Sequence, residues 1–193
     1  MDREKKELLQ EKRARLQEKI KLEELLESDF KPQIELFSEW KKKGITFTPK
    51  EMVLQGEFSI EIVQAALKNA PYHDDGLSAL TSTQQIEAIN RLLEKYPSQT
   101  PFRYLPAGSP LQHPPSTIGE FLSEVKKSAT SLEDRMYLYY FRYPVLVEFQ
   151  GKDLRQIPTE DLLEPWHGDA VLYPEGAGYY LVYTLEEDFF VLE

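Results

Sequence analysis

Residues 136–149 read MYLYYFRYPVLVEF, two aromatic and β-branched runs separated by a join that contains Pro144. Runs of this kind, about five residues long and bounded by turn residues, are typical of β-strands. Three similar runs follow, separated by glycine, proline and acidic residues. Because the joins are short, the sequence predicts an antiparallel meander. Its five strands are expected at residues 137–141, 145–149, 170–173, 179–185 and 189–192.

The run at residues 179–185 has no polar face. Its side chains alternate between two faces, and each face carries both tyrosine and an aliphatic residue. We therefore expect both faces of the sheet to be covered, one by helices and the other by a loop or the N-terminal helix. The alternative is a tyrosine-rich face that is exposed for a partner.

Helical patterns fill the chain before the sheet. Residues 1–28 contain sixteen charged residues, several leucines, and no glycine or proline. Pro32 begins a second predicted helix, which ends at Gly44. Thr48 and Glu51 match a capping box, with Pro49 at the first helical position, so a short helix is expected there. Further helices are predicted to begin at Ser59, Ser82, Thr117 and Thr159.

These patterns together define an α+β fold class. Six of the thirteen prolines fall between Pro97 and Pro115, which predicts a linker or a wrapped loop. We expect an N-terminal charged helix and a small helical subdomain, followed by a C-terminal antiparallel β-sheet with flanking helices. The predicted divisions are a charged helical extension (1–29), a helical subdomain (30–96), a Pro-rich connection (97–116) and an α+β sheet domain (117–193).

Charge is distributed unevenly along the chain. The formal net charge is -10, but residues 1–50 carry 13 basic and 11 acidic side chains, a net of +2. The remaining residues carry 10 basic and 22 acidic side chains, a net of -12. The last 38 residues contain nine carboxylates, seven aromatic rings and no lysine or arginine. Such a surface attracts cations and repels nucleic acid and anionic lipid.

The sequence therefore predicts a non-enzymatic, acidic protein-binding protein that occludes a basic surface on a partner. Inhibitors, antitoxins and immunity proteins act in this way, and the comparison with them rests on charge and size alone. Carboxylates would speed the encounter and aromatic rings would supply the affinity. The predicted binding residues are Trp166, Asp169, Tyr173, Glu175, Tyr179, Tyr183, Glu186, Glu187, Asp188 and Phe190.

A metal-dependent hydrolase or nuclease is the first alternative. Two short segments, at residues 73–75 and 167–169, place histidine beside aspartate, which are groups that bind metals or transfer protons. The same residue types also make ordinary turns. No metal, cofactor or catalytic residue is predicted under the main hypothesis, because no P-loop, dinucleotide fingerprint or nucleophile elbow is present. The alternative metal ligands are His73, Asp74, His167 and Asp169.

A structural or assembly protein is the second alternative, with a possible homodimer through residues 1–28. Leu9, Leu16 and Ile20 form a narrow seam, but Arg13 interrupts it and three full heptads are not sustained. A charged helix that faces water is the simpler interpretation.

The sequence also predicts where in the cell the protein lies. Its longest apolar run, at residues 136–141, is six residues, whereas a membrane-spanning helix needs about 20. The N-terminus opens with charged residues, and the sequence contains no cysteine. We expect a cytoplasmic protein that is not anchored to a membrane.

Overall fold

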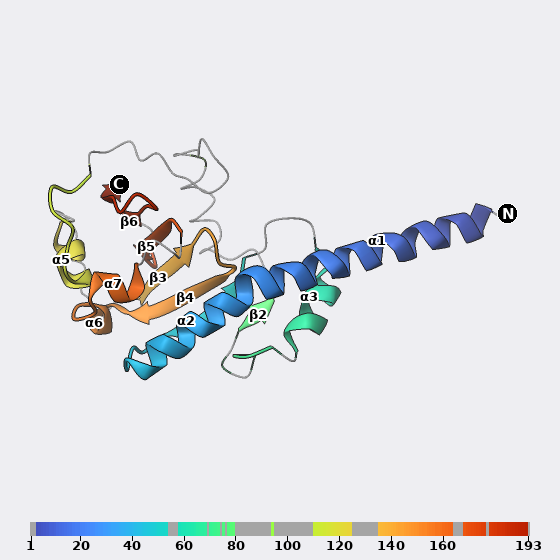
Figure 1. Cartoon of the computed structure of the whole chain (residues 1–193), viewed down its shortest axis with the longest axis horizontal. Helices are drawn as coiled ribbons and strands as arrows, with labels where there is room; N and C mark the ends of the chain where they lie inside the picture. Colours follow the sequence, from blue (N-terminus) through green and yellow to red (C-terminus); the bar gives the residue numbers. More distant parts are fainter. Residues whose placement is uncertain are drawn as a thin grey trace.

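The structure, a computed structural model, is shown in Figure 1. The structure describes most of the 193 residues. These residues are 3–53, 58–68, 70–73, 75, 77–79, 94, 110–124, 135–163, 168–176 and 178–192.

The chain begins with a long, continuous run of helix. α1 (Arg3–Leu25) continues through a π-helical turn, η1 (Leu26–Phe30), into α2 (Lys31–Lys42). Pro32 lies in the first turn of α2, directly after η1, and because it has no N–H group it cannot donate the helical hydrogen bond expected at its position in a continuous helix. Gly44 follows α2 with a φ of 78°, a left-handed conformation that commonly ends helices. Both helices predicted in this region are confirmed, although no break separates them.

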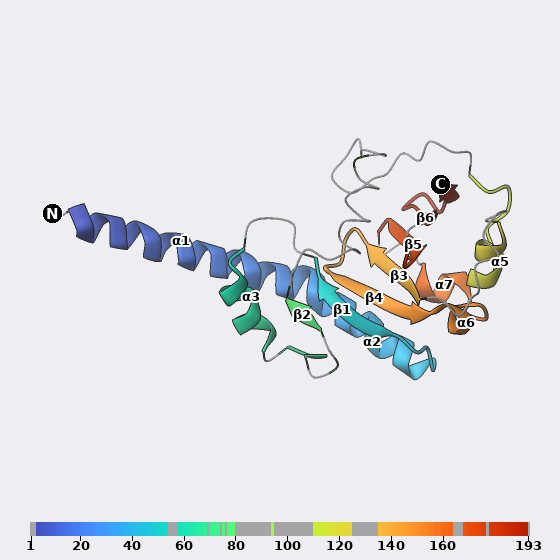
Figure 2. The ribbon, with the colours of Figure 1, turned by 180° about the vertical axis from the view of Figure 1, so that it is seen from behind.

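A seven-stranded sheet lies at the centre of the protein, in the order β2-β1-β4-β3-β5-β6-β7. Every neighbouring pair is antiparallel except β1 and β2, which are parallel. Figure 2 shows β1 beside β4 from behind. The predicted α+β class and all five predicted strands are confirmed. The strands are β1 (Thr48–Met52), β2 (Ser78–Ala79), β3 (Arg135–Tyr140), β4 (Val145–Gln150), β5 (Ala170–Pro174), β6 (Tyr180–Tyr183) and β7 (Phe189–Leu192).

The short helix predicted to begin at Thr48 is wrong, because this segment is strand β1. The strand pairs along β4, with Thr48 opposite Glu148 and a shift in register between Pro49 and Glu51. β2 pairs only with Glu51 and Met52, so Pro49 lies where β1 has no second neighbour in the described sheet. Proline is tolerated at such a position because no ladder partner needs its N–H group.

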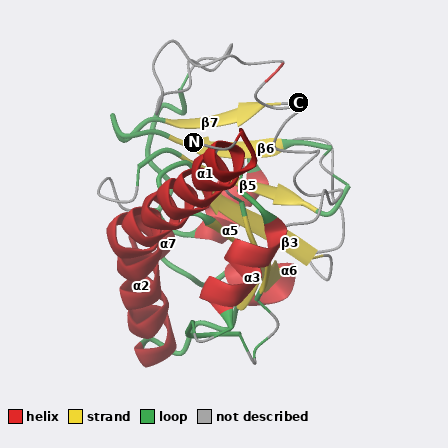
Figure 3. Cartoon of the chain, turned by 90° about the vertical axis from the view of Figure 1, so that its right-hand side faces the viewer, coloured by secondary structure: helices red, strands yellow, loops and turns green. Residues whose placement is uncertain are grey.

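In the described part of the chain, four short helices lie around the sheet. α5 begins as predicted, with the Thr117 hydroxyl accepting from the Glu120 N–H group at 3.2 Å. The Glu120 carboxylate in turn accepts from the Ser116 N–H group at 2.7 Å. In Figure 3, α3 lies beside α1. The helix predicted at Ser82 falls outside the described residues apart from Glu94. The four helices are α3 (Ile60–Leu67), α5 (Ile118–Ser123), α6 (Gly151–Leu154) and α7 (Thr159–Leu162).

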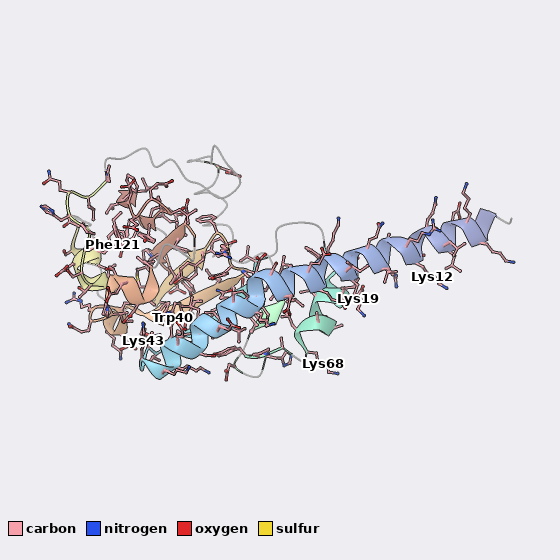
Figure 4. All side chains as sticks on the ribbon, viewed as in Figure 1. Lys12, Lys19, Trp40, Lys43, Lys68 and Phe121 are labelled. Carbon is pink, nitrogen blue, oxygen red and sulfur yellow. The ribbon has the colours of Figure 1, made fainter. Side chains whose placement is uncertain are left out.

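α2 packs on one face of the sheet. Trp40 is fully buried, and its ring lies 5.7 Å from that of Phe149 on β4 (Figure 4). The Trp40 indole N–H group donates to the Asp161 carbonyl in α7 at 2.8 Å. Buried Gln33 donates to the Val145 carbonyl at 2.8 Å and accepts from the Val145 N–H group at 2.9 Å. Aromatic packing and these paired polar contacts together fix α2 against the sheet.

Both faces of the sheet are buried, as predicted. Leu181 and Tyr183 of β6 point into the core that includes α2, α5 and α7. Tyr180 and Val182 point into a second apolar cluster on the other face. Tyr180, the most exposed of these four side chains, is 8% exposed. The alternative of an exposed tyrosine-rich face is therefore wrong for β6.

The segment 30–96 is not wholly helical, because β1 and β2 contribute to the same sheet as the C-terminal strands. This shared sheet makes the hydrogen bonds of β1 depend on β4, far along the chain. The divisions proposed at residues 29, 96 and 116 stay predictions, and residues 97–109 lie outside the described residues.

Candidate acidic binding site

A cavity of about 510 Å³ opens between α7 and the turn that joins β6 to β7. It lies at the end of the molecule that is far from the N-terminus (Figure 1). We call it the acidic cavity, because no lysine or arginine is among the described residues that line it. The lining residues are Leu111, Pro114, Thr159, Glu160, Leu163, Tyr183, Glu187, Asp188 and Phe189.

A tight turn holds two of the carboxylates in place. The Thr184 N–H group donates to the Asp188 carbonyl at 3.1 Å, and the Glu187 N–H group donates to the Thr184 carbonyl at 2.9 Å. The Asp188 N–H group donates to the Thr184 hydroxyl at 3.3 Å. Glu187 has a φ of 64°, which is uncommon for a residue with a side chain. The turn therefore presents Glu187 and Asp188 side by side.

The opposite wall is the first turn of α7. The Thr159 hydroxyl donates to the Pro115 carbonyl, and the Thr159 N–H group donates to the Ser116 carbonyl at 3.1 Å. Glu160 follows with an exposed side chain. A second connection joins the segment before α5 to β7, because the Leu111 N–H group donates to the Phe189 carbonyl at 2.8 Å. These bonds fix the position of Glu160, the third carboxylate of the cavity, relative to the β6–β7 turn.

Apolar side chains complete the lining. The rings of Tyr183 and Phe189 lie 4.8 Å apart, and Phe121 of α5 stacks edge-on against Phe189 at 5.2 Å. Leu163 is also buried. The aliphatic stem of a lysine or arginine can pack on such a surface while its charged group meets the carboxylates. The arrangement is suited to binding a cationic side chain.

The structure brings together only part of the predicted binding set. Tyr183, Glu187 and Asp188 line the cavity, and Glu186 is exposed next to them. Glu175 is exposed in the turn after β5, where it pairs with Arg135 at 3.5 Å. Asp169 is buried and accepts from the Leu185 N–H group at 2.8 Å, so it stabilises the end of β6.

The other predicted aromatic residues lie inside the protein or outside the described part. Tyr173 is fully buried, and burial raises the pKa of its hydroxyl far above the ordinary value. Tyr179 and Phe190 are at most 7% exposed. These three rings pack in the two apolar cores. Trp166 lies outside the described residues. Buried rings stabilise the fold, and Tyr183 and Phe189, at 3% and 7% exposed, are about as buried as these three, so the described residues expose little aromatic surface to the cavity.

The alternative metal set is only half described. His73 is exposed in the turn after α3, and Asp169 is the buried side chain that accepts from Leu185. Asp74 and His167 lie outside the described residues. Within the described residues, no group of three or more histidine, aspartate and glutamate side chains is arranged to hold a metal ion.

Glu160 was not among the predicted binding residues, because a carboxylate at a helix start is usually a local charge on the helix. The sequence pattern around Glu160 gives no sign that its carboxylate lies near those of the β6–β7 turn. α7 and the β6–β7 turn are distant in sequence, and only the folded sheet brings Glu160 toward Glu187. Leu111 and Pro114 lay in a segment interpreted as a connection, so their place beside β7 was also not anticipated.

Comparisons with protein-family models, with curated proteins and with solved structures found no match to this chain. Among the described residues, no helix is both long enough and apolar enough to cross a membrane.

Proposed function

We propose that this protein is a non-enzymatic binding protein whose acidic cavity receives a lysine or arginine side chain of a basic partner. The observation that carries the proposal is the group of three carboxylates, Glu160, Glu187 and Asp188, around an apolar floor. The described lining supplies no basic side chain to neutralise them. A partner's cation would therefore meet negative charge that the site itself leaves uncompensated.

The wider charge distribution supports the same role. Residues beyond Lys50 carry a net charge of -12, so a basic partner is attracted from a distance and held by the cavity at contact. By covering the partner's basic surface, the protein would act as an inhibitor, antitoxin or immunity protein does. A cytoplasmic setting remains part of this proposal.

The test begins with co-purification of the tagged protein from its native extract at low and high salt, with identification by mass spectrometry. The expected result is one basic protein in near-equal amount, released as salt screens the charges. The association rate of that partner is then compared between the wild type and a cavity variant carrying Glu160→Gln, Glu187→Gln and Asp188→Asn. We expect the variant to associate more slowly and with a weaker salt dependence.

A matched control separates the cavity from overall charge. Glu61→Gln, Glu124→Gln and Asp153→Asn change the net charge equally but alter exposed side chains outside the acidic cavity. The control should keep an association rate close to that of the wild type. Equal slowing by both triple variants would show that the cavity has no special role, and no effect of either would contradict the proposal.

A further inference from the structure

The N-terminal part of α1 extends away from the rest of the protein (Figures 1 and 2). The Glu18 carboxylate accepts a hydrogen bond from the Ser59 N–H group at the start of α3. Leu22, one turn further, is 1% exposed and belongs to the core. We call residues 3–20 the N-terminal arm, because the side chains of Leu8 to Gln17 are all exposed.

The arm carries an apolar seam that faces away from the body. Leu9, Leu16 and Ile20 are spaced by seven and four residues, which places them on one side of a helix. Their exposed fractions are 49%, 58% and 44%, respectively. Leu22 and Leu25 point to the opposite side, where the helix meets the body. An exposed apolar seam on a helix is the surface that another helix covers in a coiled coil.

Basic side chains border this seam on one side and interrupt it. Lys5, Lys12 and Lys19 recur every seven residues along one edge, which we call the lysine edge. Lys6 and Arg13 precede Ile20 at intervals of seven residues, so they interrupt the seam itself. Figure 4 shows Lys12 and Lys19 projecting from α1. Lys19 pairs with Glu23 at 3.6 Å, but both side chains are more than 60% exposed, so water screens the pair and it adds little stability.

These charges disfavour a second copy of the chain as the occupant. An antiparallel pair would place the lysine edges against each other, since equivalent flanking positions meet in that orientation. A parallel pair would bring Arg13 against the partner's Arg13 within the seam. Like charges at such positions are destabilising.

An anionic lipid surface is also poorly suited to cover the seam of the N-terminal arm. Residues 3–25 include six glutamates among eight basic residues, so their net charge is only +2. The seam is narrow and this segment contains no aromatic residue. Helices that lie in a membrane interface usually combine a strongly basic face with a broad apolar face that contains large side chains.

We propose that the N-terminal arm binds a helix of a different protein, one whose leucine or isoleucine stripe is flanked by glutamate or aspartate. The stripe would cover Leu9, Leu16 and Ile20, while the acidic flanks would meet the lysine edge. This surface is distinct from the acidic cavity, which lies at the other end of the molecule and takes the opposite charge (Figure 1).

The experiment uses the full-length protein and two synthetic helical peptides with identical leucine and isoleucine stripes. One peptide carries glutamate at every flanking position, and the other carries lysine. Fluorescence anisotropy measures their affinities. We expect the glutamate peptide to bind at least about tenfold more tightly than the lysine peptide. Affinities that differ less than this, or an absence of binding by both peptides, would overturn the proposal.

Three variants identify the contact. Leu16→Gln should abolish binding of the glutamate peptide, and a Lys5→Glu, Lys12→Glu, Lys19→Glu variant should prefer the lysine peptide. A control with the same charge change, Lys42→Glu, Lys68→Glu and Lys152→Glu, alters exposed lysines of the body and should keep the original preference. Circular dichroism checks that each arm variant retains its helix. Unchanged binding by Leu16→Gln would refute a role for the seam.

Two further measurements test the alternative occupants of the seam, which are a second copy of the chain and anionic lipid. A dimer in sedimentation equilibrium that Leu16→Gln dissociates would assign the seam to a second copy. Binding to vesicles of phosphatidylcholine and phosphatidylserine, lost in the same variant, would assign it to lipid. Either result would overturn the proposal. All arm variants leave Glu160, Glu187 and Asp188 in place, so failure here is separate from failure of the proposed function.

Discussion

Glu187 combines an unfavourable backbone conformation with an exposed carboxylate at the acidic cavity. Its φ of 64° brings the Cβ atom of an L-residue close to its own backbone, whereas glycine adopts this conformation without a clash. Strained residues of this kind are concentrated at functional sites, where the side chain serves a purpose that outweighs its effect on stability. Glu187 thus places a carboxylate at the cavity in a conformation that its own side chain disfavours.

Replacing Glu187 with glycine should stabilise the protein and weaken binding at once. Relief of the left-handed strain exceeds the extra chain entropy of glycine, so the free energy of unfolding should rise by roughly 0.5–1 kcal/mol. Urea denaturation measures this change. Glu187→Gln is the matched control, because it removes the charge but keeps the strain. Equal stability of the two variants would show that the turn is not strained.

Tyr137 makes the stability of the folded protein depend on pH in the alkaline range. Burial, followed by the nearby Glu148 carboxylate, raises the pKa of its hydroxyl from the ordinary value of 10.0 to about 12. The hydroxyl donates to Glu148 at 3.3 Å, a bond that requires the proton. Between these two pKa values the unfolded chain has lost the proton and the folded protein keeps it. The unfolded state then binds fewer protons, so stability falls as pH rises.

The expected result is a urea midpoint that is constant just below pH 10 and falls as pH approaches 12. In Tyr137→Phe this fall should be smaller, because one tyrosine that contributes to it is gone. Some decline should remain, since burial also raises the pKa of Tyr173. A variant whose midpoint follows the wild-type curve throughout would contradict the assignment to Tyr137.

At the scale of elements, α2 and β4 are joined by Gln33, whose amide satisfies both polar groups of the Val145 backbone. Gln33 is fully buried, so neither its own amide nor Val145 has water as a substitute partner. An unpaired buried backbone group destabilises more than a surface hydrogen bond stabilises. This contact holds the helix that carries Trp40 in position on the sheet.

Gln33→Leu should therefore lower the free energy of unfolding by about 2–4 kcal/mol, since two buried backbone groups lose their partner. Thermal and urea unfolding followed by circular dichroism measure the loss. Gln64→Leu, an equal change at an exposed position on α3, should leave stability almost unaltered. If the two variants were equally stable, the Gln33 contacts would contribute nothing measurable.

Strands β3 to β7 were predicted and β1 was not, because local sequence favours the strand conformation in the first group only. β3 to β7 are rich in aromatic and β-branched residues, whose local preference agrees with the final fold. Thr48, Pro49 and Glu51 instead carry the residues of a helix start. Their strand conformation comes from pairing with β4, a contact that local sequence does not encode. Tertiary pairing overrides local preference at this position.

At the scale of the whole molecule, the sequence pointed to the acidic residues of the β6–β7 turn but not to the geometry of the candidate site. Residues 186–188 were predicted binding residues, and Glu187 and Asp188 line the cavity. Amphipathic tyrosines serve equally well in a core and at an interface, so composition alone did not separate Tyr173 from an exposed ring. Glu160 needed the fold itself, because two segments distant in sequence form the two walls.

The helix of the N-terminal arm continues through η1 into α2, so a single helical run joins the arm to the body of the protein. α1 has 23 residues, and at about 1.5 Å per residue it spans roughly 35 Å. The far end of the same helix is fastened to β4 by Gln33 and to α7 by Trp40. One helical run therefore reaches from the N-terminal arm to the residue that contacts α7, the wall that carries Glu160.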